Sequence, residues 1–268
     1  MTRRALSLAY LTSHRCTAAE AVVTAAQAGY GFVGIRMLPN APGAPCQALI
    51  GDAAAQRETR AALRDTGVGL FDLEIIRIGA AFDLHAWDAM LALGQELGAR
   101  AVLVAGDDPE PARLATHYAQ VCERVGRHGM TADLEFMPWT AVPDARSACR
   151  VIEQAGCPAN AGVLVDALHV GRSQTTLDDI RAIPRAWLHY AQICDGEAGT
   201  GFSTEQLIHT ARCERLLPGE GTIDLHGLFG ALPADLPVSV EVIHLERERE
   251  ADPLSWARAC LAASRPYL

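Results

Sequence analysis

Four polar side chains stand near the ends of otherwise apolar runs: Glu135 in Asp-Leu-Glu-Phe-Met, Asp166 in Val-Leu-Val-Asp-Ala, Gln192 in Tyr-Ala-Gln-Ile-Cys-Asp and Glu241 in Val-Ser-Val-Glu-Val. Any one of them alone is compatible with an ordinary strand-end charge. Three carboxylates converging on one pocket, however, repel one another and raise each other's pKa unless a cation neutralises them. All four offer oxygen donors, which suit Mg²⁺ or Mn²⁺ better than a zinc site of His and Cys. We therefore expect one divalent metal ion, Mg²⁺ or Mn²⁺, with Zn²⁺ and Co²⁺ as alternatives.

The elements that must position these residues form a regular series. Short apolar runs alternate with longer amphipathic stretches, a pattern typical of repeated βα units with a parallel sheet. The runs cover residues 6–11, 32–37, 69–76, 101–105, 131–137, 162–167, 188–194 and 238–243. Eight strands with helices between them favour a closed (β/α)8 TIM barrel over an open sheet. The four polar residues then lie on strands five to eight, at the mouth.

The length of 268 residues, half of them hydrophobic, allows one large core, and no composition break marks a second domain. We expect a single domain over residues 1–268. The long loops 38–56, 196–202 and 217–222 follow strands and are expected over the mouth, where such loops form lids. Thr17 with Glu20, and Ser203 with Gln206, predict capping boxes, and Pro143 is expected in the first turn of a helix.

Composition excludes several classes of function. The net charge of -9 argues against a nucleic-acid partner, which needs a concentrated basic surface. All 23 basic residues are Arg, so the absence of Lys excludes Schiff-base chemistry. The eight cysteines form no CxxC pair, which indicates reduced thiols. No run of about 18 apolar residues predicts a membrane span, and residues 5–11 are expected to be a strand rather than a signal peptide. We expect a cytoplasmic protein, and the sequence leaves a homo-oligomer open.

Nearly the whole chain resembles the xylose isomerase-like TIM barrels. This family includes sugar phosphate isomerases and epimerases, inosose dehydratase, dehydroshikimate dehydratase and endonuclease IV of the AP endonuclease family 2 superfamily. The segments that carry the resemblance are 134–136, 166–169, 192–195, 215–221 and 240–242. The resemblance implies that Glu135, Asp166, Gln192 and Glu241 bind the metal. Many sugar isomerases have His at the third position, so Gln192 is more similar to the 3-dehydroshikimate dehydratase branch.

The resemblance also implies proton transfer next to a carbonyl group, through an enediolate that the metal stabilises. Glu135 and Glu241 are the candidates for base and acid. His169, three residues after Asp166, is expected to contact the substrate or shuttle a proton; a lone His is otherwise more often structural.

Further residues are expected to bind the substrate, a small polyhydroxylated carbonyl compound that could be anionic. Arginines suit a carboxylate or phosphate because their donors bind both anions bidentately. Arg36 could instead pair with Glu74, Arg215 with Glu220, and Trp139 could pack in the core rather than against a substrate ring. Arg77 also reaches the expected mouth, whereas residues 107–108 and 246–250 are expected to be a turn and a solvated charge cluster. The predicted substrate-binding residues are Arg36, Glu74, Trp139, Arg172, Asp195, Arg215 and Glu220.

The leading hypothesis is therefore a metal-dependent sugar isomerase or epimerase. The nearest alternative is a dehydratase of the 3-dehydroshikimate or inosose type, because the same metal ligands support elimination of a β-hydroxyl. An endonuclease IV-like DNA repair nuclease ranks low, since it needs additional His ligands and a basic groove. A non-catalytic sugar-binding protein would be expected to lose the acid and base, and both Glu135 and Glu241 are present.

Overall fold

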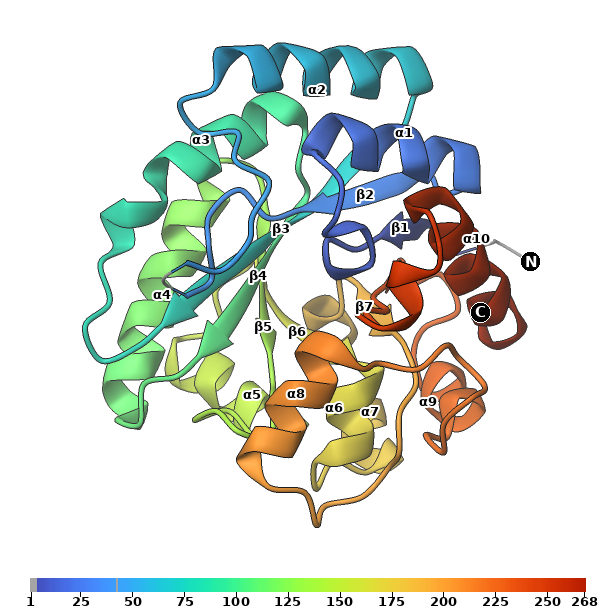
Figure 1. Ribbon diagram of the computed structural model, residues 1–268. Coiled ribbons are helices and arrows are strands. Elements are labelled where there is room, and N and C mark those ends of the chain that lie inside the picture. Colours follow the sequence, from blue (N-terminus) through green and yellow to red (C-terminus); the bar gives the residue numbers. More distant parts are fainter. Residues whose placement is uncertain (1–3, 42) are drawn as a thin grey trace.

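Eight parallel strands close into a barrel in chain order, and β8 pairs back to β1. The computed structural model describes residues 4–41 and 43–268. Figure 1 shows the helices arranged outside the ring of strands. The predicted (β/α)8 TIM barrel is confirmed. The strands are β1 Leu6–Leu8, β2 Phe32–Ile35, β3 Gly69–Ile78, β4 Ala101–Gly106, β5 Thr131–Glu135, β6 Ala161–Asp166, β7 Ala191–Ile193 and β8 Val238–Val240.

Every predicted strand is present, but several are shorter than their apolar runs. The run 188–194, for example, contains only the three residues of β7. A 3₁₀ turn at Arg185–Trp187, whose C-cap is Leu188, precedes that strand. The helices are α1 Ala18–Ala28, α2 Ala53–Thr66, α3 Asp88–Leu97, α4 Pro111–Gly126, α5 Ala145–Gln154, α6 Ala167–Arg172, α7 Leu177–Ala182, α8 Thr204–Cys213, α9 Leu225–Ala231 and α10 Pro253–Ser264. Among the described residues, no helix combines the length and apolar character that a membrane crossing needs.

Helix ends follow local side-chain chemistry. The capping boxes of Thr17 with Glu20 and of Ser203 with Gln206 are confirmed at the starts of α1 and α8. The expectation for Pro143 is wrong, because α5 begins at Ala145 and Pro143 lies two residues before it, outside the first turn. Its N-cap is Asp144, whose carboxylate accepts the N–H of Ser147 at 2.7 Å. That charged acceptor satisfies a free N–H at the start of the helix, which proline cannot do.

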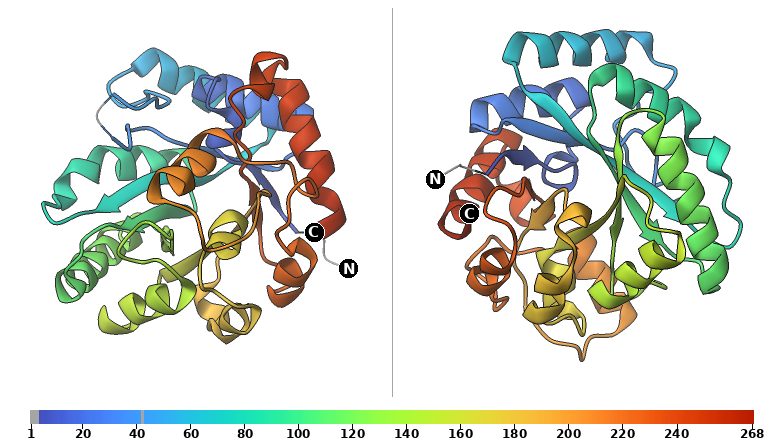
Figure 2. Two further views of the ribbon diagram at one scale, coloured as in Figure 1. Left: turned by 60° about the horizontal axis from the view of Figure 1, so that its bottom comes forward. Right: turned by 180° about the vertical axis from the view of Figure 1, so that it is seen from behind.

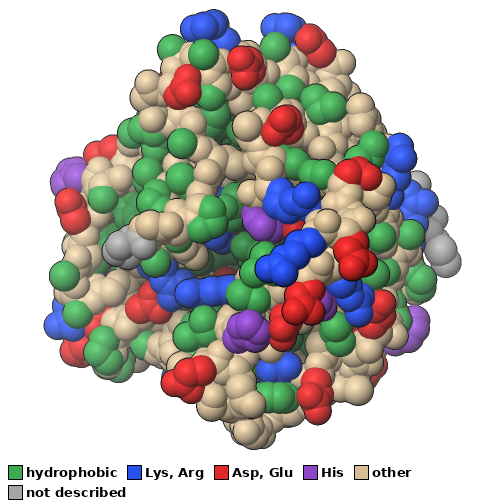
Figure 3. All heavy atoms as spheres, viewed as in Figure 1, with side chains coloured by type: hydrophobic (Ala, Val, Ile, Leu, Met, Phe, Trp, Pro, Cys, Tyr) green, Lys and Arg blue, Asp and Glu red, His purple; other side chains and the backbone are tan. Residues whose placement is uncertain are grey.

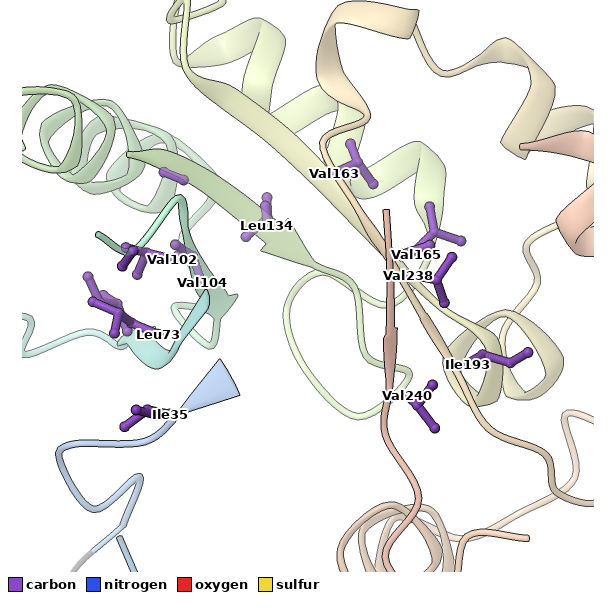
Figure 4. Packing of buried hydrophobic residues seen from close by; sticks show 14 of the residues in the cluster. Ile35, Leu73, Val102, Val104, Leu134, Val163, Val165, Ile193, Val238 and Val240 are labelled. Carbon is purple, nitrogen blue, oxygen red and sulfur yellow. The ribbon is translucent and has the colours of Figure 1, made fainter. Parts of the chain in front are cut away.

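The core has two layers because successive strand residues point to opposite faces. One set of side chains packs outward against the helices, and Figure 4 shows Val102, Val104, Leu134, Val163 and Val165 among them. The other set fills the barrel interior, where Phe71 packs edge-on against Phe32 and Tyr190 with ring centroids 5.5 Å and 5.2 Å away. These rings close the barrel interior, so polar interior groups can gather at its C-terminal end.

Two irregularities shape that end. The pairing of β3 with β4 shifts register between Leu73 and Ile76, which lets the consecutive residues Glu74 and Ile75 both line one cavity. The other is α8, the first of two helices between β7 and β8; Figure 2 shows it from two sides. The chain leaving α8 forms antiparallel bridges at 195↔216 and 214↔244, and so ties itself to the continuations of both strands.

Candidate active site

A cavity of about 300 Å³ opens at the C-terminal end of the barrel. The face in Figure 3 is hollowed near its centre, and arginine side chains gather beside the hollow. The lining combines acids, arginines, histidines and apolar groups: Tyr10, Leu11, His14, Arg36, Asn40, Ala41, Ala44, Pro45, Glu74, Ile75, Arg77, Leu103, Glu135, Met137, Trp139, His169, Ala211, Arg212, Arg215, Glu241, Ile243 and Leu245.

The four residues predicted to bind metal lie near one another at the C-terminal end of the barrel; Glu135 and Glu241 line the cavity, whereas Asp166 and Gln192 do not. Glu135 and Asp166 end β5 and β6, Gln192 lies opposite Asp166 on β7, and Glu241 follows β8. The amide of Gln192 donates to Oε1 of Glu241 at 3.0 Å. Ligand atoms of Glu135, Asp166 and His169 lie within 4.8 Å of one another. All five side chains are buried.

This donor set fits a divalent cation. Oε1 of Gln192 is buried without a hydrogen-bond partner in the protein, while its Nε2 is occupied by Glu241. A buried acceptor left unpartnered calls for a donor or a cation. Around it stand three carboxylates, whose combined charge is only partly balanced by protein groups. Within 4–41 and 43–268, Glu135, Asp166 and His169 form the one His, Cys, Asp and Glu group compact enough to hold an ion, and Glu241 is not part of it.

Arg215 supplies the nearest positive charge, and it does so as an ion-pair partner. Its Nη1 lies 2.7 Å from Oδ2 of Asp166, and its Nη2 lies 2.8 Å from Oε2 of Glu241. The backbone N–H of Arg215 donates to the carbonyl of Ile243 at 2.8 Å, so the bridges after α8 fix the side chain between β6 and β8. The expected pair of Arg215 with Glu220 is not formed.

The two carboxyls that share Arg215 have opposite pKa shifts. Burial raises the pKa of Asp166, but Arg215, His169 and the His169 N–H outweigh it, so the net direction is downward. Burial raises the pKa of Glu241 well above its usual value, and the carboxylates of Glu74, Asp166 and Glu135 add to this against the charge of Arg215. Of the two, Glu241 is therefore the carboxyl whose pKa is raised, and Asp166 the one whose pKa is lowered.

His169 lines the cavity beside Glu135. Asp166 caps α6 by accepting the N–H of His169 at 3.1 Å, so one residue both offers a ligand atom and positions this ring. Nε2 of His169 lies 3.4 Å from Oε1 of Glu135, and Nδ1 is buried without a partner. Trp139 meets the imidazole edge-on with ring centroids 5.1 Å apart, and its indole Nε1 is also unpartnered.

Arg36 and Glu74 form a buried ion pair at the cavity wall, as one of the two sequence interpretations expected. Nη2 of Arg36 lies 2.7 Å from Oε2 of Glu74, and the guanidinium stacks 4.2 Å from the ring centre of Tyr10. Burial raises the pKa of Glu74, and Arg36 opposes that shift. Nε of Arg36 is buried without a partner.

Three predicted substrate-binding residues do not line the cavity. Arg172 stacks 3.6 Å from the ring centre of Phe202, and its Nε donates to the backbone carbonyl of Glu197. Asp195 accepts the N–H groups of Gly219 and Gly221 at 2.9 Å and 3.0 Å, and so holds the 217–222 turn. Glu220 pairs with Arg247 at 2.6 Å on the surface. Their contacts are structural.

Other lining residues were not identified from the sequence. Tyr10 and His14 follow β1, and their place just beyond a strand end is the signal that could have found them. Arg212 lies in the last turn of α8 and carried no such signal. The expectation of a solvated cluster at 246–250 is wrong for Glu248, which is buried and binds Nε2 of His14 at 2.8 Å.

Comparison with known proteins places these features in a wider group. Residues 22–262 match a family model described as xylose isomerase-like TIM barrel. Among curated proteins, none matches the chain.

Solved structures share the fold at low sequence identity. A xylose isomerase-like TIM barrel/4-hydroxyphenylpyruvate dioxygenase fusion protein is 21% identical with a TM-score of 0.81; the match covers 97% of this chain, which spans only 42% of that protein. The IolI protein with a bound zinc atom is 16% identical with a TM-score of 0.80, over 98% of this chain and 97% of that one. The D-allulose 3-epimerase from Methylomonas sp. in complex with D-allulose is 15% identical with a TM-score of 0.70, over 100% and 98%.

Proposed function

We propose, on the premise that this chain belongs to the xylose isomerase-like TIM barrel family, that it is a divalent-metal-dependent isomerase or epimerase. Its substrate would be a small polyhydroxylated carbonyl compound, and its reaction a proton transfer at the carbon next to the carbonyl. The bound zinc of the IolI structure and the bound sugar of the D-allulose 3-epimerase are consistent with this proposal.

One observation carries the proposal: two buried carboxyl groups face the same cavity from different surroundings. Glu135 stands beside His169, whereas Glu241 contacts Arg215 and Gln192. Enzymes that move a proton away from carbon and back need one group to accept it and another to return it. Because the two carboxyl groups have different neighbours, one is suited to accept the proton and the other to return it.

The residues then divide the work. Glu135 removes the carbon-bound proton, and Glu241, which contacts Arg215 and Gln192, returns a proton to carbon. His169 lies within reach of Glu135 and orients a substrate hydroxyl, while Trp139 and Met137 exclude water from one side of the cavity. Glu135, Asp166, Gln192 and Glu241 would hold the divalent ion, which supplies a Lewis acid beside the developing negative charge.

A dehydratase is the second candidate, and two observations favour it. Gln192 stands in the predicted metal set, where the resemblance links it to the dehydroshikimate dehydratase branch, and arginines line the cavity. Elimination begins with the same proton removal, after which a β-hydroxyl leaves as water instead of the proton returning to carbon. Glu241, carrying its proton, would then protonate the departing hydroxyl.

The test uses protein loaded with Mn²⁺ and compares two readouts. In deuterated water, an isomerase or epimerase places solvent deuterium at C1 or C3 of a ketose, or at C2 of the aldose formed from it, which mass spectrometry detects. A dehydratase instead produces the ultraviolet absorbance of a conjugated acid from 3-dehydroshikimate. Glu135→Gln should abolish either signal, while Glu58→Gln, an exposed change on α2, should leave it unchanged. Neither signal across a panel of ketoses and dehydroshikimate would contradict the proposed function.

A further inference from the structure

We propose that the ligand of this cavity carries an anionic group, a carboxylate or a phosphate, which binds at the rim to Arg212 together with Arg36 and Arg77. This inference rests on the proposed function, because it names a substrate class for the same site. Of the arginines predicted from the sequence for this role, it keeps only Arg36, since Arg215 is occupied at the floor and Arg172 lies outside the cavity; Arg212 and Arg77 take their place.

Arg212 is the principal observation. It lines the cavity from the last turn of α8, and it is exposed. Among residues 4–41 and 43–268, it makes no ion pair and no hydrogen bond, unlike the neighbouring Arg215. A guanidinium is a strong donor with a permanent charge, so an unpartnered one facing a cavity is available for a ligand.

The surroundings of Arg212 concentrate positive charge. Burial lowers the pKa of its guanidinium most, and the charges of Arg77 and Arg36 lower it further, with only partial relief from Asp107. Like charges gathered around a cleft repel one another, but they raise the local concentration of an oppositely charged ligand. An anion bound at the rim would relieve that repulsion.

Arg36 and Arg77 keep donors for such a ligand. Arg36 uses Nη2 on Glu74, while its buried Nε has no partner. Arg77 pairs with Asp107 through Nη2 at 2.6 Å. Each guanidinium has five N–H donors in a planar fork, so one carboxylate contact leaves others free for a second anion.

The distribution of charge in the cavity also sets the orientation of the ligand. The floor holds Glu135, Glu241 and His169. Unless a metal is bound, its carboxylates would repel the anionic group of a ligand. The opposite side offers arginines. A cavity of about 300 Å³ suits a small molecule whose anionic end lies at the rim and whose carbonyl and hydroxyl groups reach the floor.

Calorimetric titration of the intact protein tests the inference with three probes that share one six-carbon polyol chain: sorbitol, D-gluconate and sorbitol 6-phosphate. The measurement is made at physiological ionic strength, where weak surface attraction is screened. We expect the Kd of one or both anions to be at least about tenfold lower than that of sorbitol. The tighter anion identifies carboxylate or phosphate as the preferred group.

Variants locate the preference. Arg212→Gln should abolish it without changing the thermal unfolding, whereas Arg57→Gln, which removes an exposed arginine of α2 outside the cavity, should retain it. The inference is overturned if sorbitol binds as tightly as the anions, if no probe binds, or if Arg212→Gln keeps the preference. Because this readout is binding alone, failure of isotope exchange with an intact anion preference would contradict the proposed function and leave the rim site standing.

Discussion

Arg215 and Asp166 form an ion pair at the floor of the cavity, with 2.7 Å between Nη1 and Oδ2 and both side chains buried. The same guanidinium also contacts Glu241, so one arginine bridges carboxyls from β6 and from the residue after β8. Removing one partner of a buried pair leaves an uncompensated charge, which is a much larger loss than breaking a surface pair.

Arg215→Gln should therefore lower the free energy of unfolding by about 3–5 kcal/mol. Chemical denaturation followed by circular dichroism measures the change. Arg181→Gln, which removes an exposed ion pair with Asp178 at 2.7 Å, is the matched control and should change stability by less than about 1 kcal/mol. Equal effects of the two substitutions would show that the bridge contributes little to stability.

Glu241→Gln should reduce turnover by about 10²–10⁴-fold, the usual contribution of a positioned acid or base, while the fold survives. The rate of deuterium incorporation or of elimination provides the measurement, and far-ultraviolet circular dichroism checks the fold. A variant that turns over at the wild-type rate would remove Glu241 from the chemistry.

Addition of Mn²⁺ or Mg²⁺ to metal-depleted protein should raise the thermal midpoint. Binding to the folded state alone adds about 2.7 kcal/mol when the free ion is at 100 times its Kd. Asp166→Asn should weaken this response, because it removes one of the predicted oxygen ligands. No shift with Mg²⁺, Mn²⁺, Zn²⁺ or Co²⁺ would contradict the metal site.

His189 should make stability fall as pH rises above neutrality. Burial lowers its pKa, but the hydrogen bond to Asp133 at 2.6 Å and the charge of that carboxylate raise it more, to a net value above the ordinary 6.5. The protonated pair is fully stabilising below about pH 6.5, and this contribution is lost as the pH rises through the folded pKa. Thermal midpoints measured from about pH 5.5 to about pH 8.5 should show a flatter profile for His189→Gln than for wild type. An unchanged slope would exclude this pair as its source.

Asp72 should act in a more acidic window. Its carboxyl is buried in the barrel, and neither oxygen has a hydrogen-bond partner in the protein. Burial and the charges of Glu74 and Asp133 raise its pKa well above 3.8. The folded state therefore keeps a proton that the unfolded chain releases, and stability falls as pH rises above about 3.8. Asp72→Asn should remove that part of the slope in denaturation at several pH values, whereas exposed Asp178→Asn should not. Identical slopes for wild type and Asp72→Asn would contradict this assignment.

The barrel and its four polar strand ends could be predicted because both depend on local patterns. Alternating apolar runs indicated eight strands, and Glu135, Asp166, Gln192 and Glu241 interrupt four of them. Parallel strands in a closed barrel bring their C-terminal ends to one mouth, so adjacency along the ring follows from chain order.

The positions of loop residues could not be predicted in the same way. Arg215 reaches Asp166 because antiparallel bridges tie its segment to chain after β7 and β8, and those pairings are far apart in sequence. Asp195 faces backbone N–H groups of a turn more than twenty residues later, and Arg172 packs on Phe202. Sequence spacing indicated the residue types suited to a mouth, but tertiary contacts determine which of them face the cavity.

The segment between β7 and β8 that contains α8 matters for the redesign of this barrel, because it carries two of the site arginines. Arg212 at the rim and Arg215 at the floor are three residues apart on this segment, the first in the last turn of α8 and the second just after it. Exchanging the segment with that of another barrel would alter ligand preference and the charge balance of the reacting groups in a single event. Under the proposed roles, we therefore expect substitutions of single rim side chains to change ligand preference with less effect on the floor than grafting the whole segment.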